Sequence, residues 1–249
     1  MQQQKQFKVL LIGDSCTDEY VYGTCDRLNP EAPVPILNFN RKETNKGMAW
    51  NVRENLISFG IEVVILTNEE TITKTRYIDE RSNQHILRLD DEPILKPMEH
   101  QLPEEDFDAL VISDYDKGFL TVRRICELVS EFEGPVFLDS KKTVLPSQGC
   151  FIKINETEKK LLTGDYNNLI VTKGAGGADY DGVNYPAEKT KVYDVVGAGD
   201  TFLSALVYFH LFYGRIEEAI PYANKAASIA VQNFGTYVLT EEDVQDLRD

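Results

Sequence analysis

The chain has 249 residues and a mass of 28.3 kDa, with 42% hydrophobic and 27% charged residues. Because this apolar fraction is enough for a buried core, the composition excludes a disordered or collagen-like chain. No apolar run approaches the roughly 20 residues of a membrane helix. A formal charge of −15 argues against nucleic-acid or anionic-membrane partners, which need a positive surface.

The polar start of the chain, residues 1–6, has no signal-peptide architecture, so we expect a cytoplasmic protein. The cysteines form no CxxC pair, which favours reduced thiols over a zinc site; they are Cys16, Cys25, Cys126 and Cys150. We see no boundary between independent domains and expect one domain over residues 1–249.

Short apolar runs alternate with helical patterns. The runs are continuous, which is typical of parallel strands covered on both faces; they are Val9–Ile12, Val63–Leu66, Ala109–Ile112, Val136–Leu138, Phe151–Ile154 and Leu169–Thr172. Helices are expected at Ala49–Phe59, Thr121–Phe132, Glu156–Leu162, Gly199–Phe212, Ile216–Asn233 and Glu241–Leu247. This alternation predicts an α/β fold, a three-layer sandwich with a mostly parallel central sheet.

Additional β-like segments interrupt the alternation. Four of them are expected to form a small β lid within about residues 18–42 and 72–92; they are Tyr20–Gly23, Val34–Phe39, Thr73–Ile78 and Gln84–Asp90. Later in the chain, the Asp181-Gly182 pair predicts a β-hairpin turn.

The strongest local motif is Asp194-Val-Val-Gly-Ala-Gly-Asp200, which opens a long helix. Gly197 and Gly199 permit a tight turn, and the helix N-terminus adds N–H donors and the positive end of its dipole. Together with Ala198 they form an anion cradle. Asp200 is then either a helix cap or a base that takes a proton from an attacking hydroxyl while the cradle stabilises a transferred phosphoryl group.

A second glycine-rich segment follows the strand that ends at Thr172. Its residues Lys173, Gly174 and Gly177 suit backbone contact with nucleotide phosphates. An ordinary flexible turn is the alternative interpretation.

Asn155 and Glu158 lie three residues apart at a predicted helix start. Their oxygens suit Mg²⁺, bound directly or through water. The more common arrangement is structural, with Asn155 as the N-cap and Glu158 completing a capping box.

Polar residues also cluster near the N-terminus, after the first strand and at the first helix. Asp14, Asp18 and Asn51, with Gly47 before the helix, suit hydrogen bonding to sugar hydroxyls beyond the carboxyl ends of the strands. Turn chemistry and helix capping explain the same residues without a ligand.

In this order, and over nearly the whole chain, these motifs resemble the ribokinase/PfkB superfamily of carbohydrate kinases. The most similar branch is the heptose kinase part of bifunctional ADP-heptose synthesis proteins. The segments that carry this finer resemblance are Leu28–Pro35, Lys74–Arg76, Leu87–Asp90, Ser113–Gly118, Asp139–Lys141 and Tyr222–Ala227.

The resemblance implies phosphorylation of D-glycero-D-manno-heptose 7-phosphate at its anomeric hydroxyl, with ATP and Mg²⁺. Asp200 would be the general base, and Gly197, Ala198 and Gly199 the anion hole. Asn155 and Glu158 would organise Mg²⁺, and the ATP-facing residues would be Thr172, Lys173, Gly174, Gly177 and, near adenine, Asn224. Sugar hydroxyls would be bound by Asp14, Asp18, Asn51 and the backbone at Gly47. The candidate cations for phosphate groups are Lys74, Arg76, Arg88, Lys117 and Lys141.

The resemblance further implies a homodimer that pairs through the lid strands. A separate nucleotidyltransferase would be needed for ADP-heptose formation, because no H-x-G-H motif follows Asp200.

The chain departs from the family pattern at several places. Met48 and Trp50 replace small residues of the sugar-site motif and are expected to narrow or reshape the sugar pocket; Asp116 replaces a glycine, and the segments after Leu66 and Glu158 are short. These departures leave two alternatives: a kinase for another sugar or sugar phosphate, and a non-catalytic sugar or nucleotide sensor. Retention of the catalytic motif favours activity.

Overall fold

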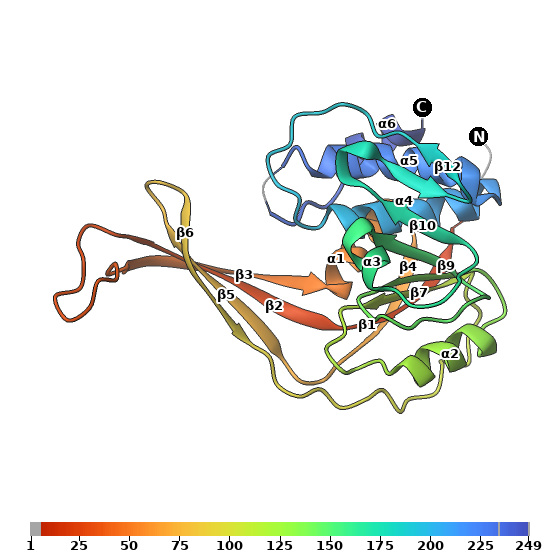
Figure 1. The fold of residues 1–249 in the computed structure, drawn as a ribbon, viewed down its shortest axis with the longest axis horizontal. Helices are drawn as coiled ribbons and strands as arrows, with labels where there is room; N and C mark the ends of the chain where they lie inside the picture. Colours follow the sequence, from red (N-terminus) through yellow and green to blue (C-terminus); the bar gives the residue numbers. More distant parts are fainter. Residues whose placement is uncertain (1–5, 234, 249) are drawn as a thin grey trace.

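The central element is an eight-stranded sheet, seen in a computed structural model that describes residues 6–233 and 235–248 (Figure 1). Most of the polar chain start, residues 1–5, lies outside this description. The strands are β1 (Lys8–Gly13), β4 (Glu62–Thr67), β7 (Ala109–Asp114), β8 (Val136–Ser140), β9 (Phe151–Asn155), β10 (Leu169–Thr172), β11 (Ala178–Tyr180) and β12 (Val183–Tyr185). Their order is β12-β11-β10-β9-β8-β7-β1-β4, parallel from β4 to β10, with β11 and β12 antiparallel.

The two faces of this sheet bury two separate apolar clusters, which confirms the three-layer prediction. On β1, Val9 and Leu11 face one cluster, and Leu10 and Ile12 face the other, as the period of two requires. The first cluster is covered by α1 (Ala49–Ser58), α4 (Ala198–Tyr213), α5 (Ile216–Ala230) and α6 (Glu241–Arg248). The second is covered by α2 (Val122–Glu131) and adjoining loops. The remaining helix is α3 (Glu156–Leu161).

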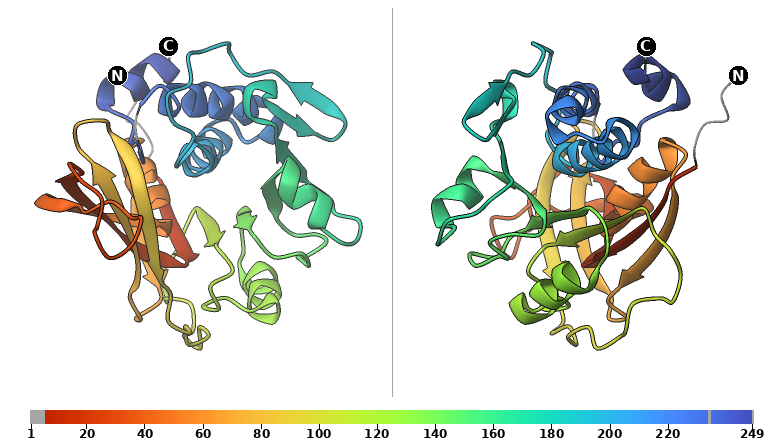
Figure 2. Two further views of the ribbon diagram at one scale, coloured as in Figure 1. Left: turned by 60° about the vertical axis from the view of Figure 1, so that its left-hand side comes forward. Right: turned by 90° about the vertical axis from the view of Figure 1, so that its right-hand side faces the viewer.

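A second sheet of four strands extends away from this sandwich as a lid (Figures 1 and 2). Its order is β3-β2-β5-β6, with β2 (Ser15–Thr24), β3 (Asn38–Met48), β5 (Ile72–Asp79) and β6 (Gln84–Asp91). The predicted strand at Val34–Phe39 was wrong. The lid strand begins at Asn38 and runs through the charged segment to Met48. Nine of the eleven residues of β3 are exposed, so the strand lacks the apolar pattern on which the prediction depended.

Other predicted elements differ from the observed ones mainly at their ends. The last long helix ends at Ala230 rather than Asn233. The hairpin between β11 and β12 is confirmed, because Asp181 and Gly182 adopt φ values of +47° and +76°, as a type I′ turn requires. All four cysteines are free thiols. Among the described residues, no helix is both long and apolar enough to span a bilayer.

Candidate active site

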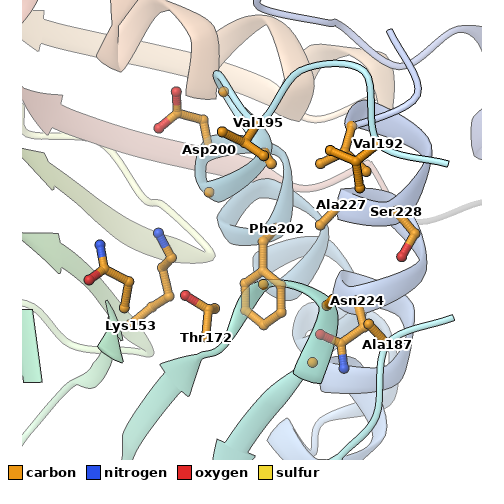
Figure 3. Close-up of a pocket in the computed structure, with 18 of the residues that line it drawn as sticks. Lys153, Thr172, Ala187, Val192, Val195, Asp200, Phe202, Asn224, Ala227 and Ser228 are labelled. Carbon is orange, nitrogen blue, oxygen red and sulfur yellow. The ribbon is translucent and has the colours of Figure 1, made fainter. Parts of the chain in front are cut away.

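A pocket of about 750 Å³ lies where β8, β9 and β10 end beside the start of α4 (Figure 3). This volume is in the range of small-molecule sites. The pocket brings together many predicted residues that are far apart in sequence: Lys141, Asn155, Thr172, Gly174, Gly177, Gly197, Ala198, Gly199, Asp200 and Asn224. The other predicted site residues do not line it: Asp14, Asp18, Gly47, Asn51, Arg88, Lys117, Glu158 and Lys173.

The glycine turn before α4 is closely surrounded by polar side chains. Gly197 has a φ of +77°, and a methyl group there would lie 2.8 Å from Nδ2 of Asn51. At Gly199, a methyl group would lie 2.9 Å from Nζ of Lys153. The backbone conformation therefore favours glycine at Gly197, and a side chain at either position would displace the polar group beside it, the Asn51 amide or the Lys153 ammonium group.

Asp200 lies in the first turn of α4 and is 6% exposed. Its Oδ2 accepts a hydrogen bond from Nδ2 of Asn51 at 2.8 Å, and its Oδ1 accepts one from the hydroxyl of Tyr115 at 2.9 Å. Burial raises the pKa of Asp200, and the Asn51 amide and Tyr115 hydroxyl oppose that rise. The carboxylate is not a helix cap, because the N-cap of α4 is Gly197.

Asn51 was predicted to bind a sugar hydroxyl, but its amide donates to the carboxylate of Asp200. Asp14, fully buried, accepts two backbone hydrogen bonds on Oδ2, from Tyr115 at 2.7 Å and from Lys117 at 3.3 Å. Its Oδ1 has no hydrogen-bond partner among the described residues. Burial, followed by repulsion from Asp114, raises the pKa of Asp14 to about 6. Asp14 thus keeps one acceptor oxygen for a further donor.

Asp18 and Gly47 lie side by side where the lid joins the sandwich. A side chain at Gly47 would collide with the Asp18 carboxylate. Asp18 Oδ1 pairs with Arg76 at 2.5 Å, so this carboxylate is already engaged. This ion pair links two neighbouring strands of the lid, β2 and β5, near the base of the lid.

The candidate phosphate-binding cations are each paired with a carboxylate. Lys117 and Lys74 share Glu92, at 2.6 and 4.0 Å. Arg88, whose side chain is 56% exposed, pairs with Asp90 in its own strand. A phosphate group bound by one of these cations would therefore compete with a carboxylate of the chain itself.

The capping interpretation of the Asn155 motif is confirmed. Oδ1 of Asn155 accepts from the N–H groups of Thr157 and Glu158, and Glu158 Oε2 accepts from the N–H of Asn155 at 2.8 Å. Oε1 of Glu158 accepts from Lys141. Burial opposes ionisation of Glu158, but these bonds together lower its pKa, so it is a carboxylate at neutral pH.

The same residues decide how Mg²⁺ would fit. Within residues 6–233 and 235–248 no group of three or more His, Cys, Asp or Glu side chains is arranged to hold a metal ion. A carboxylate beside the pocket, with its oxygens already hydrogen-bonded, fits Mg²⁺ held mainly by phosphate oxygens and water. Direct coordination by Asn155 Oδ1 is not supported by its capping bonds.

The glycine-rich segment after β10 folds as a 3₁₀ turn, Gly174–Gly176, at the pocket rim. Gly177, with a φ of +85°, packs against the backbone at Tyr185, so a side chain there would collide with it. Lys173 was predicted to face ATP, but it does not line the pocket. Its ammonium pairs with Asp179 at 2.7 Å, because the antiparallel strand β11 presents that carboxylate to it.

The far wall of the pocket is largely apolar and comes from α4, α5 and the loop before the glycine turn (Figure 3). It includes Val192, Val195, Phe202, Ala227 and Val231. Asn224 lies within it and donates from Nδ2 to the carbonyl of Tyr185 at 2.8 Å, which leaves its amide oxygen as an acceptor.

Among the pocket residues to which the sequence analysis gave no role are Tyr115, Asp139 and Lys153. Asp139 and Lys153 form a buried ion pair of 2.5 Å between β8 and β9. The available signal for Lys153 was a lysine between two buried isoleucines. For Tyr115 no local signal existed, since its contact with Asp200 spans 85 residues.

Met48 and Trp50, expected to narrow the sugar site, do not line this pocket. Met48 is buried in the second apolar cluster and has a φ of +58°, a strained conformation for a residue with a side chain. The Trp50 ring lies against Nζ of Lys46, 3.6 Å from its centroid, with the guanidinium of Arg53 at 5.2 Å.

Residues 149–243 match the model of the pfkB family of carbohydrate kinases. The chain is 30% identical over 301 aligned positions to the bifunctional protein HldE of Nitratiruptor sp., covering 96% of the chain and 64% of that protein. The corresponding protein of Pasteurella multocida is also 30% identical, over 97% of the chain and 63% of that protein. The chain belongs to the PfkB carbohydrate kinase family.

Solved structures agree with this PfkB membership at the level of the fold. The ribokinase of Thermotoga maritima superimposes with a TM-score of 0.72 at 16% identity, over 97% of this chain and 99% of that one. The ribokinase of Arabidopsis thaliana, complexed with ribose and ATP, gives 0.71 at 16% identity, over 98% and 99%. The chain spans slightly less than two thirds of the HldE proteins it matches, and their 301 aligned positions exceed its 249 residues, which fits its shortened segments.

Proposed function

We propose that this PfkB protein transfers the γ-phosphoryl group of ATP to a hydroxyl of a sugar phosphate. The observation that carries the proposal is the buried Asp200 carboxylate, held on both oxygens by Asn51 and Tyr115 at the glycine turn and facing the pocket. A carboxylate so oriented takes the proton of an incoming alcohol as the O–P bond forms. The backbone N–H groups of the turn Gly197–Gly199 would stabilise the negative charge on the phosphoryl group during its transfer.

The pocket suits ATP as the donor. Its apolar wall around Phe202 and Ala227 accommodates a heteroaromatic base, and the free amide oxygen of Asn224 accepts from an exocyclic amino group. The phosphates would then run along the 3₁₀ turn toward Asp200. Mg²⁺, when bound there, neutralises phosphate charge; Glu158 would hold it through water.

The proposed acceptor is D-glycero-D-manno-heptose 7-phosphate, phosphorylated at its anomeric hydroxyl. The support is the resemblance of the segments Leu28–Pro35 and Leu87–Asp90 to the heptose kinase branch. The unpartnered Oδ1 of Asp14 would accept a hydrogen bond from a sugar hydroxyl. Closure of the lid over the sugar would exclude water, which otherwise competes as acceptor.

A different sugar phosphate is the second candidate acceptor. The strained Met48 at the junction of β3 and α1 favours it, because its side chain stands where the family motif has a small residue.

A coupled assay of ADP release tests both candidates, with Mg-ATP and heptose 7-phosphate, fructose phosphates or ribose as acceptor. We expect turnover with heptose 7-phosphate and a fall in kcat of about 10³-fold or more in Asp200→Asn. The melting temperature and ATP affinity of the variant should stay near those of the wild type. Turnover with a different acceptor alone would select the second candidate, and ATP binding without turnover on any acceptor would refute the kinase proposal.

A further inference from the structure

Lys153 is a buried lysine in the middle of a core strand. It is 5% exposed, and its neighbours Ile152 and Ile154 are fully buried. Its Nζ lies 2.5 Å from Oδ2 of Asp139, directly across from it in the parallel register of β8 and β9. A buried ion pair adds little net stability compared with apolar side chains of the same size, so the fold alone does not explain its presence.

The Lys153 ammonium group lies at the catalytic glycine turn. A methyl group on Gly199 would be 2.9 Å from Nζ, and both residues line the pocket. Figure 3 shows the Lys153 side chain extending from β9 toward the start of α4, where Asp200 lies. The positive charge of Lys153 also opposes the rise in the pKa of Asp200 and helps to lower the pKa of Glu158.

Burial distinguishes Lys153 from the two other lysines that line the pocket, Lys141 and Lys189. Lys189 is exposed. The Lys141 side chain is 42% exposed, its ammonium pairs with Glu158, and it lies 5.5 Å from the ring centroid of Tyr115. The Lys153 side chain is 7% exposed and has one carboxylate partner. An ammonium group has three N–H donors, so Lys153 keeps donors for a second anion in a site where water competes weakly.

We propose that Lys153 is a catalytic residue that donates hydrogen bonds to the γ-phosphoryl oxygens of ATP, and that Asp139 positions it. This inference rests on the proposed function and names a contact of the same site. Lys153 keeps its proton throughout. The sugar oxygen forms a bond to phosphorus, the bond from phosphorus to the ADP oxygen breaks, and Asp200 receives the hydroxyl proton.

The test replaces the ion pair by neutral pairs, since Lys153→Gln alone would leave the Asp139 carboxylate buried without its partner. The double variant Lys153→Gln with Asp139→Asn retains polar side chains. A second, Lys153→Met with Asp139→Leu, replaces the pair by apolar side chains, a change that is often neutral or stabilising. Asp139→Asn alone keeps the cation. The control variant is Lys8→Gln, which removes a lysine that is also paired with carboxylates but lies at the first residue of β1, outside the pocket.

Affinities for Mg-ATP and Mg-ADP are measured by calorimetry in each variant, together with kcat. We expect both double variants to bind ADP within about threefold of the wild type and to lose ATP affinity by about tenfold or more, because only ATP carries the contacted group. kcat should fall about 10²-fold. Lys8→Gln should retain the preference for ATP over ADP. Asp139→Asn keeps the cation but removes the carboxylate that positions it, so it should lose part of that preference, less than either double variant.

Equal losses of ATP and ADP affinity, or wild-type kcat in a double variant, would overturn the role of Lys153. The nucleotide measurements need no acceptor, so they are independent of the proposed reaction. If the wild type phosphorylates no sugar and the ATP preference still disappears in the double variants, the proposed function fails and the contact stands.

Discussion

Asn51 donates a hydrogen bond to Asp200 over 2.8 Å, although 149 positions separate the two residues. The bond joins the start of α1 to the start of α4, two helices that pack in the same apolar cluster. With Tyr115 on the other oxygen, it holds the carboxylate in one orientation. Each oxygen retains acceptor capacity, so the carboxylate can still take a substrate proton.

Tyr115→Phe tests this arrangement through the pH dependence of kcat. The Tyr115 hydroxyl helps to lower the pKa of Asp200, so its removal should raise that pKa. Because the base acts only when ionised, the acid limb of the kcat profile should move to higher pH. Tyr166→Phe, which removes a hydroxyl bonded to Thr163 outside the pocket, is the matched control. An unmoved acid limb in Tyr115→Phe would contradict the role of this bond.

Gly199→Ala tests the close approach at the glycine turn. The added methyl group would lie 2.9 Å from Nζ of Lys153 and displace it, so we expect kcat to fall about tenfold or more. Gly214→Ala is the comparison. It has open space but a φ of +77°, so it should cost about 1 kcal/mol of stability and leave kcat unchanged. Thermal unfolding gives the stability of each variant, and steady-state kinetics give its kcat. Equal kcat values in Gly199→Ala and Gly214→Ala would contradict the importance of the close approach at Gly199.

Asp14→Asn should change how stability depends on pH. Because the pKa of Asp14 is raised to about 6 in the folded protein, the folded state binds its proton more tightly than the unfolded state. The contribution of the protonated Asp14 carboxyl to the unfolding free energy is therefore fully present below about pH 4. It is lost as pH rises through about 6, by up to about 3 kcal/mol.

Asparagine stays neutral throughout this range. Relative to wild type, the unfolding free energy of Asp14→Asn should rise by that amount between pH 4 and pH 7.5, as measured by urea denaturation. A difference between the two proteins that stays constant with pH would show that Asp14 titrates normally.

The lid strands lead to a prediction about assembly. Leu87 and Leu89 lie two residues apart on the edge strand β6 and are 59% and 53% exposed. Exposed apolar side chains on a sheet edge are typical of an interface. In sedimentation experiments the wild type should have twice the 28.3 kDa mass of one chain. Leu87→Asp with Leu89→Asp should shift it to the single-chain mass. A monomeric wild type, or an unchanged dimer in the variant, would count against the lid dimer.

The strands of the parallel sheet could be predicted because both of their faces are buried, which produces continuous apolar runs such as Val9–Ile12. The lid strand β3 could not be placed from its sequence. Both of its faces are largely exposed, and its register is set by pairing with β2 rather than by apolar pattern.

The amino-acid sequence by itself determined the α/β architecture, the glycine turn and the position of Asp200, because each depends on residues within a few positions of one another. Only the tertiary structure decided which side chains surround that carboxylate. Asn51, Tyr115 and the Asp139–Lys153 pair reach the glycine turn from separate elements, across as many as 149 positions. Their partners are fixed by the packing of α1 and α4 and by the register of β8 and β9. A local pattern can mark one member of such a contact, as the lysine between two isoleucines does for Lys153, but it does not identify the partner.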